Sequence, residues 1–194
     1  VTIPVKRILA YTDGYTPVEA NVSFMWGADH SIYVYAEVID DSVVTDSQNL
    51  INDFGVKSDN VDCVEIYMYW GNGEQIVQYK VTSDGKLYCY QQAHNGVTPS
   101  IQESGDANER FDAAVKTTDV GYDAEFKIKS NLVALSQGAM LSFKVVVVST
   151  DDENSGICSV TNFGNPYTTQ RYHKKNITST QAYANMMLVD ADGA

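Results

Sequence analysis

The chain has 194 residues, of which 44% are hydrophobic, and its formal net charge is -12. This length and composition predict a single domain, residues 1–194, with a substantial core. Only 13 Lys and Arg stand against 25 Asp and Glu, which argues against nucleic acid and anionic membrane surfaces as partners. No apolar run is long enough to cross a membrane as a helix, so we also expect no membrane insertion.

Most of the chain alternates between apolar and polar residues with the period of half-buried strands. Turn residues such as Gly, Asn and Asp separate these segments. The predicted strands cover residues 1–10, 20–26, 31–39, 63–69, 77–81, 86–91, 111–117, 122–129, 140–148, 156–161 and 185–189. Many short strands of this kind indicate an all-β fold, an antiparallel β-sandwich or jelly roll.

Three segments lack clear periodicity. Residues 46–60 are polar and irregular, and residues 92–109 and 162–183 are predicted to be long loops. By contrast, Val145–Val148 is a continuous apolar run. We therefore expect the strand that contains it to be central and covered on both faces.

The segment over residues 62–81 is predicted to form a central β-hairpin. Its apolar positions are expected to face the core. The opposite face then carries Glu65, Tyr67, Tyr69, Gln78 and Lys80. An acceptor, an amide, a cation and flat rings on one face suit a polyhydroxylated ligand better than a hydrophobic or phosphorylated one. The alternative is a solvated sheet face with an ordinary cross-strand ion pair.

The three cysteines, Cys63, Cys89 and Cys158, match no zinc or redox motif. Three buried, inert thiols are the favoured interpretation. One disulfide with one free thiol remains the alternative, and the spacing does not select the pair.

The order of motifs along the chain resembles a known family. Residues 21–41 are followed by Asp-Cys-Val-Glu-Ile-Tyr at 62–67 and by Gln-Tyr-Lys-Val at 78–81. Arg-Phe at 110–111 comes next, and residues 185–189 end the set. In this order the chain is similar to a family 9 carbohydrate-binding module, of the kind attached to xylanases and other polysaccharide-degrading enzymes. The resemblance covers nearly the whole chain.

The resemblance implies a β-sandwich that binds plant cell-wall polysaccharide, such as xylan or cellulose, or its sugar ends, without catalysing a reaction. It also implies a secreted or cell-surface location, in a larger multimodular protein that the module tethers to glycan. The family's sugar-binding Glu and Gln fall on Glu65 and Gln78. Its Arg falls on Lys80, which keeps the charge but loses the planar two-pronged donor.

The family clamps a sugar ring between two tryptophans, and neither tryptophan of this chain stands at a matching position. The first position is Asp59, whereas the last long loop offers Tyr167 and Tyr172 as a stacking surface. Tyr67 lies on the same face as the polar hairpin residues. Trp70, beside the glycine turn, is predicted either to form an exposed platform or to fold back on its strand.

The resemblance also implies structural calcium. Asp40, Asp41, Asp151 and Asp152 are the candidate ligands, because calcium prefers carboxylate and carbonyl oxygens. None of them lies in a helix-loop-helix calcium loop. Acidic turn residues that cap backbone amides are the alternative interpretation.

Two other functions remain open. One is an adhesion or scaffold module whose exposed aromatic residues dock protein. The other is a haem-binding sandwich with an axial ligand such as Met25, Met68 or His94. A glycoside hydrolase would need two carboxylates that face each other across a cleft. No motif marks such a pair, so we expect no enzyme activity.

Overall fold

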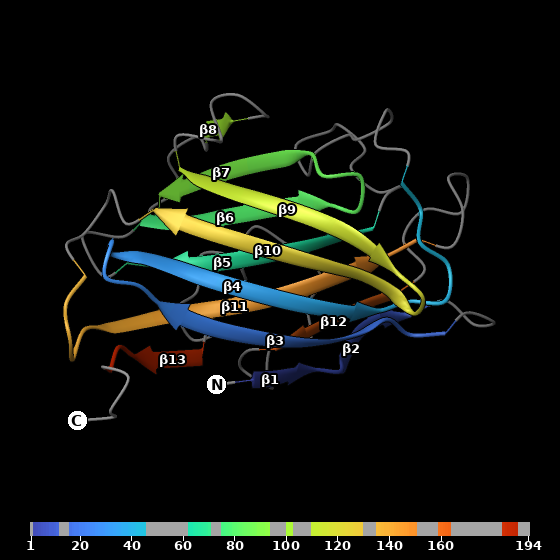
Figure 1. Cartoon of the computed structure of the whole chain (residues 1–194), viewed down its shortest axis with the longest axis horizontal. Coiled ribbons are helices and arrows are strands. Elements are labelled where there is room, and N and C mark those ends of the chain that lie inside the picture. Colours follow the sequence, from blue (N-terminus) through green and yellow to red (C-terminus); the bar gives the residue numbers. More distant parts are fainter. Residues whose placement is uncertain are drawn as a thin grey trace.

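The computed structural model describes residues 2–11, 16–45, 62–70, 75–93, 100–102, 110–129, 135–150, 159–163 and 184–189. Within these residues, thirteen strands form two antiparallel sheets that pack face to face (Figure 1). The described part of the chain contains no helix, and therefore no helical segment with the length and hydropathy of a membrane span. The predicted antiparallel β-sandwich is confirmed.

The five-stranded sheet has the order β1-β3-β4-β10-β9 and lies nearer the viewer in Figure 1. Its strands are Thr2–Val5 (β1), Glu19–Trp26 (β3), Ser31–Ile39 (β4), Gly121–Lys129 (β10) and Phe111–Thr118 (β9). Strands β3 and β4 pair along their length, as do β9 and β10. Pairing of β4 with β10 joins these two hairpins into one surface.

The eight-stranded sheet has the order β2-β12-β11-β5-β6-β7-β8, and β13 pairs with β11 beside this path. Its strands are Arg7–Tyr11 (β2), Cys63–Tyr69 (β5), Gln75–Thr82 (β6), Leu87–Ala93 (β7), Ser100–Gln102 (β8), Met140–Ser149 (β11), Ser159–Phe163 (β12) and Ala184–Met187 (β13). The predicted central hairpin is β5–β6. Residues 145–148 of β11 are all buried, which confirms a central strand covered on both faces.

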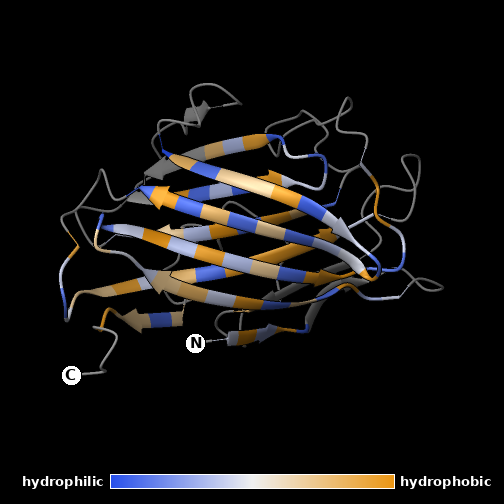
Figure 2. Cartoon of the chain, in the orientation of Figure 1, coloured by the Kyte–Doolittle hydropathy of each residue, from blue (hydrophilic) through white to orange (hydrophobic). Residues whose placement is uncertain are grey.

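The core lies between the sheets and is built by the alternation of side chains along each strand. Figure 2 shows hydrophobic and hydrophilic residues alternating along the strands of the nearer sheet. Aromatic rings cross from sheet to sheet: Tyr79 lies edge-on to Phe111 with ring centroids 5.4 Å apart, and Phe143 lies 4.7 Å from Phe24. Burial of such rings stabilises the packing by roughly 1.5–3 kcal/mol each and sets which face of each sheet points outward.

The N-terminal segment differs from the prediction. Instead of one edge strand over residues 1–10, it forms two strands at the edges of different sheets. The change falls at Lys6: Val5 pairs with β3 in one sheet, and Arg7 pairs with β12 in the other. No Gly or Pro stands at the crossing, so alternation alone does not reveal it.

Two predicted loops are also shorter than expected. Residues 92–109 include the end of β7 and the three-residue strand β8. The loop predicted from residue 162 begins inside β12, which ends at Phe163. Strands this short carry too few residues for a period to be recognised. The irregular segment over 46–60 lies outside the described residues.

Gly121, at the first position of β10, is predicted to be essential for the β9–β10 turn. Its φ is +149°, and a Cβ atom there would lie 2.2 Å from the carbonyl oxygen of Val38 on β4. We expect Gly121→Ala to lower the free energy of unfolding by about 2–4 kcal/mol, because the backbone of β4 must shift. Urea unfolding measures this change.

Gly85→Ala is the matched control. Its φ is +83°, but nothing lies within 4 Å of a Cβ at this position. We expect a loss of only about 1–2 kcal/mol, from backbone strain alone. Equal losses in the two variants would show that contact with β4 does not constrain Gly121.

Candidate functional site

Polar side chains gather on the face of the eight-stranded sheet that points away from the core. In register, Glu65 of β5 stands opposite Lys80 of β6, and Tyr67 stands opposite Gln78. Because successive side chains of a strand point to opposite faces, these four share one face. The structure therefore brings together the predicted residues of the hairpin.

This face of the hairpin is buried. The exposed fraction is 1% for Glu65, 3% for Tyr67 and 8% for both Gln78 and Lys80. Removing a carboxylate and an ammonium group from water costs several kcal/mol unless pairing and hydrogen bonds compensate. The alternative of a solvated sheet face does not fit this burial.

Glu65 is the centre of the cluster. Its Oε2 accepts a hydrogen bond of 2.7 Å from the Tyr67 hydroxyl, and its Oε1 lies 3.6 Å from Nζ of Lys80. A carboxylate held by a phenol and an ammonium group has a fixed orientation. The two contacts also offset part of the cost of burying the Glu65 charge.

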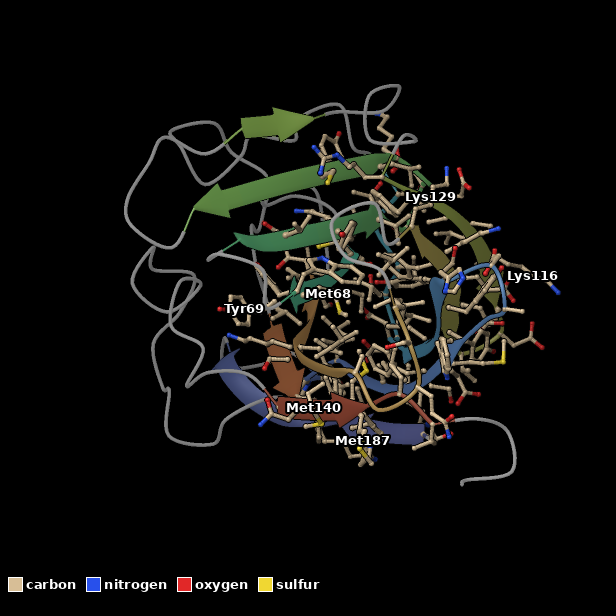
Figure 3. The ribbon with its side chains drawn as sticks, turned by 90° about the vertical axis from the view of Figure 1, so that its left-hand side faces the viewer. Met68, Tyr69, Lys116, Lys129, Met140 and Met187 are labelled. Carbon is tan, nitrogen blue, oxygen red and sulfur yellow. The ribbon has the colours of Figure 1, made fainter. Side chains whose placement is uncertain are left out.

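Tyr69 and Trp70 lie at the end of β5, on opposite faces. Tyr69 is half-buried and points away from the sandwich, whereas Met68 points into it (Figure 3). Trp70 is 3% exposed, belongs to the hydrophobic core and donates a hydrogen bond of 3.2 Å to the hydroxyl of Tyr79. Of the two alternatives for Trp70, folding back is confirmed and the exposed platform is wrong, because its even-numbered position shares the inward face of Met68.

Lys144 of β11 is a further residue of this face that the strand pattern alone does not single out. It stands opposite Tyr67 in register and is 8% exposed. The signal for it is a lysine at the outward-facing position directly before the apolar run of a strand covered on both faces. With Lys80, it places two ammonium groups on one face with Glu65.

The remaining predicted ligand and haem residues are not brought to this cluster. Tyr167, Tyr172 and His94 lie outside the described residues. Met68 packs in the core, and Met25 is 64% exposed on the other sheet.

Two of the three cysteines are buried, unpaired thiols, as favoured from the sequence. Burial raises the pKa of Cys63 to about 12 and that of Cys89 to about 11, so both remain protonated and unreactive at neutral pH. The Cys63 thiol lies 4.0 Å from Oε1 of Glu65. Cys158 lies outside the described residues.

Two buried carboxylates lie near the start of β5. Asp62 is fully buried and accepts hydrogen bonds from the backbone amides of Val44 and Thr150, both at 2.7 Å. Asp40, at the end of β4, is 7% exposed and accepts a hydrogen bond from the amide of Ser42. Asp62 therefore ties the end of β11 and the chain after β4 to the beginning of β5.

The negative charges of Asp40 and Asp62 influence each other. Burial is the main cause that raises the pKa of Asp62 to about 7, and the negative charge of Asp40 raises it further, against hydrogen bonds that lower it. Of the other predicted calcium ligands, Asp41 is exposed, whereas Asp151 and Asp152 lie outside the described residues. Among the residues that are described, no three His, Cys, Asp or Glu side chains are grouped so that they could hold a metal ion.

The protein is thus an antiparallel β-sandwich with a polar cluster on the outer face of one sheet. The family described as "Carbohydrate family 9 binding domain-like" matches residues 2–190, and the chain belongs to this family. No curated protein matches the chain.

Solved structures share the fold at low sequence identity. A family 9 carbohydrate-binding module from Caldicellulosiruptor kristjanssonii in complex with cellotriose has 18% identity and a TM-score of 0.61, over 95% of this chain and 83% of that one. The same kind of module from that organism in complex with glucose has 16% identity and a TM-score of 0.62, over 98% and 87%. A protein from Bacteroides uniformis has 11% identity and a TM-score of 0.67, over 96% and 85%.

The acidic region generates a prediction about pH. In chelator, the free energy of unfolding should fall as the pH rises from about 4 to about 7, because the pKa of Asp62 is raised on folding and the folded state binds the extra proton. The proton on Asp62 contributes about 2–4 kcal/mol to the free energy of unfolding below about pH 4, and this contribution is lost as the pH rises to about 7. Urea unfolding across this range measures it.

Asp40→Asn tests the cause of this dependence. Removal of the neighbouring charge should lower the pKa of folded Asp62, so the decline should end at lower pH and be smaller, whereas Asp41→Asn at the exposed neighbouring position should leave it unchanged. A profile of the wild type that stays flat or rises between pH 4 and 7 would contradict the prediction.

Proposed function

We propose that the chain is a non-catalytic module that binds plant cell-wall polysaccharide, or its sugar ends, through the outer face of β5 and β6. The observation that carries this proposal is the buried cluster of Glu65, Gln78 and Lys80, on which the resemblance places the family's sugar-binding Glu, Gln and Arg. Membership of a carbohydrate-binding family and the cellotriose and glucose in two similar structures support it.

The chemistry of the cluster suits sugar hydroxyl groups. A carboxylate such as Glu65 accepts hydrogen bonds, an ammonium group such as Lys80 donates them, and the amide of Gln78 does both. Charge-assisted hydrogen bonds in a water-poor site are stronger than neutral ones. Tyr69, half-buried at the end of β5, offers the edge or face of a ring to the apolar side of a sugar.

The biological context follows from this binding role. The module is secreted or displayed at a cell surface, where polysaccharide is present. It forms part of a multimodular protein and holds an attached enzyme or cell close to its glycan. The net charge of -12 is consistent with a partner that is neither nucleic acid nor an anionic membrane.

Glu65→Gln tests the proposed site, because it keeps the size and most hydrogen-bonding capacity of the side chain and removes its charge. We expect the affinity for glucose, cellotriose and soluble xylan to fall by about 10–100-fold, from the loss of one charge-assisted interaction. Isothermal titration calorimetry measures the sugars, and affinity electrophoresis measures the xylan.

Asp119→Asn, at an exposed position in the turn between β9 and β10, is the control and should bind like the wild type. Melting curves establish that both variants are folded. Unchanged binding in folded Glu65→Gln would place the sugar site elsewhere. A wild type that binds none of the probes would contradict the proposed function and favour a module that docks protein.

We also infer that a structural calcium ion binds beside Asp40. Asp40 and Asp62 supply two buried carboxylates as candidate oxygen ligands, and burial together with the charge of Asp40 raises the pKa of Asp62. A divalent cation would offset the repulsion between the two carboxylates and supply positive charge to the loops between the sheets. Asp41, Asp151 and Asp152 remain candidates for the rest of the ligand set.

Calcium addition to chelated protein at pH 7 should therefore raise the melting temperature, by about 5 °C or more for a millimolar excess over a micromolar Kd. Asp40→Asn should abolish this increase while it raises the melting temperature in chelator. Magnesium at equal concentration is the control, because its smaller octahedral shell suits such sites less well. An identical calcium response in Asp40→Asn would exclude Asp40 as a ligand.

A further inference from the structure

A hollow lies on the side of the molecule opposite the Glu65 cluster, on the outer face of the five-stranded sheet. It has a volume of about 470 Å³, in the range of small-molecule sites, and crosses β3, β4, β10 and β9. Figure 1 views this sheet from its outer face. The core separates this hollow from the Glu65 cluster, so one ligand molecule of ordinary size cannot occupy both.

The hollow arises from the side chains that meet across the strands. One row across the sheet contains Ser23, Tyr35, Glu125 and Ala114 in register. Small residues at both ends of this row leave the central ring of Tyr35 standing above its neighbours. Tyr35 is 39% exposed, so part of its ring is open to a ligand.

The second row contains Met25, Tyr33, Lys127 and Asp112, and Asp29 contacts two of these side chains. Oδ2 of Asp29 accepts a hydrogen bond of 2.9 Å from the Tyr33 hydroxyl and lies 2.8 Å from Nζ of Lys127. Both contacts hold the pKa of Asp29 well below its usual range, so this carboxylate stays ionised. Nζ of Lys127 also lies 5.6 Å from the centre of the Tyr33 ring, which fixes that ring in place.

The charges around Tyr35 define the class of ligand. Burial, together with a hydrogen bond to Asp123 and the charges of Glu37 and Glu125, raises the pKa of the Tyr35 phenol. A neutral ring with a carboxylate border repels phosphates, uronic acids and acidic protein segments. It attracts a neutral molecule that stacks an apolar face on the ring and donates hydroxyl hydrogens to the carboxylates, which describes a neutral sugar chain.

We propose that this hollow is a second glycan-binding surface that takes an internal stretch of a neutral polysaccharide, with Tyr35 as its stacking platform. The proposal rests on the proposed carbohydrate-binding role but uses a different face of the molecule. Because the hollow lies on an exposed sheet face, a long chain can pass across it without presenting an end. Two surfaces on one module would bind polymer more tightly than either alone.

The test compares Tyr35→Ala with Glu65→Gln and with the double variant. The probes are glucose, cellohexaose and insoluble cellulose, together with soluble xylan. We expect Tyr35→Ala to retain glucose binding and to lose about tenfold in affinity for cellohexaose or polymer, because stacking of one ring is lost. Tyr35→Phe keeps the ring and should bind like the wild type.

Ile39→Ala is the matched control, since Ile39 is 42% exposed on the same strand and the same face as Tyr35 but does not line the hollow. Backbone amide shifts give a second readout. In Glu65→Gln, cellohexaose should still perturb the amides of residues 33–35 and 125–127. These perturbations should vanish in the double variant.

Two outcomes would overturn the proposal. One is polymer and cellohexaose binding that is equal in Tyr35→Ala and Ile39→Ala. The other is Glu65→Gln protein that shows no perturbation at β4 and β10. Failure of the Glu65 site has a different signature, namely unchanged glucose binding in Glu65→Gln, so the two proposals are tested separately.

Discussion

The molecule depends on the two-residue period of β5 and β6. The same two strands place Val64, Ile66 and Tyr79 in the core and Glu65 and Lys80 on the outer face. A slip of one residue in register would move the charges into the core and the apolar side chains out of it. The hydrophobic packing between the sheets therefore fixes the geometry of the polar cluster, because a single register of β5 and β6 determines both.

The strand content was open to prediction because alternation reports burial directly. The strand over 31–39 has the predicted bounds, and both hairpins occur where turn residues separate alternating segments. Alternation does not report pairing partners, so the division of residues 1–10 between two sheets could not be read from it. Tertiary placement likewise decided Trp70, whose glycine-rich neighbourhood suggested exposure although its parity placed it inward.

The polar site was open to prediction only in part. The grouping of Glu65, Gln78 and Lys80 could be predicted, because strand alternation places them on one face. Their burial depends on the whole structure and not on their own strands. Lys144 comes from a distant part of the chain, and only the pairing of β11 with β5 places it on this face. The role of Asp62 is revealed only by its hydrogen bonds to the amides of Val44 and Thr150. The sequence gives the chemistry of each side chain, whereas the strand order of the sheet decides which side chains are its neighbours.

The division of the N-terminal segment has a mechanical consequence. β1 is hydrogen-bonded to β3 in one sheet, and β2, a single residue further on, is hydrogen-bonded to β12 in the other. The backbone at Lys6 thus connects the two sheets covalently at one edge of the sandwich. Separation of the two sheets at this edge therefore requires the breaking of hydrogen bonds in at least one of the two ladders, β1–β3 or β2–β12.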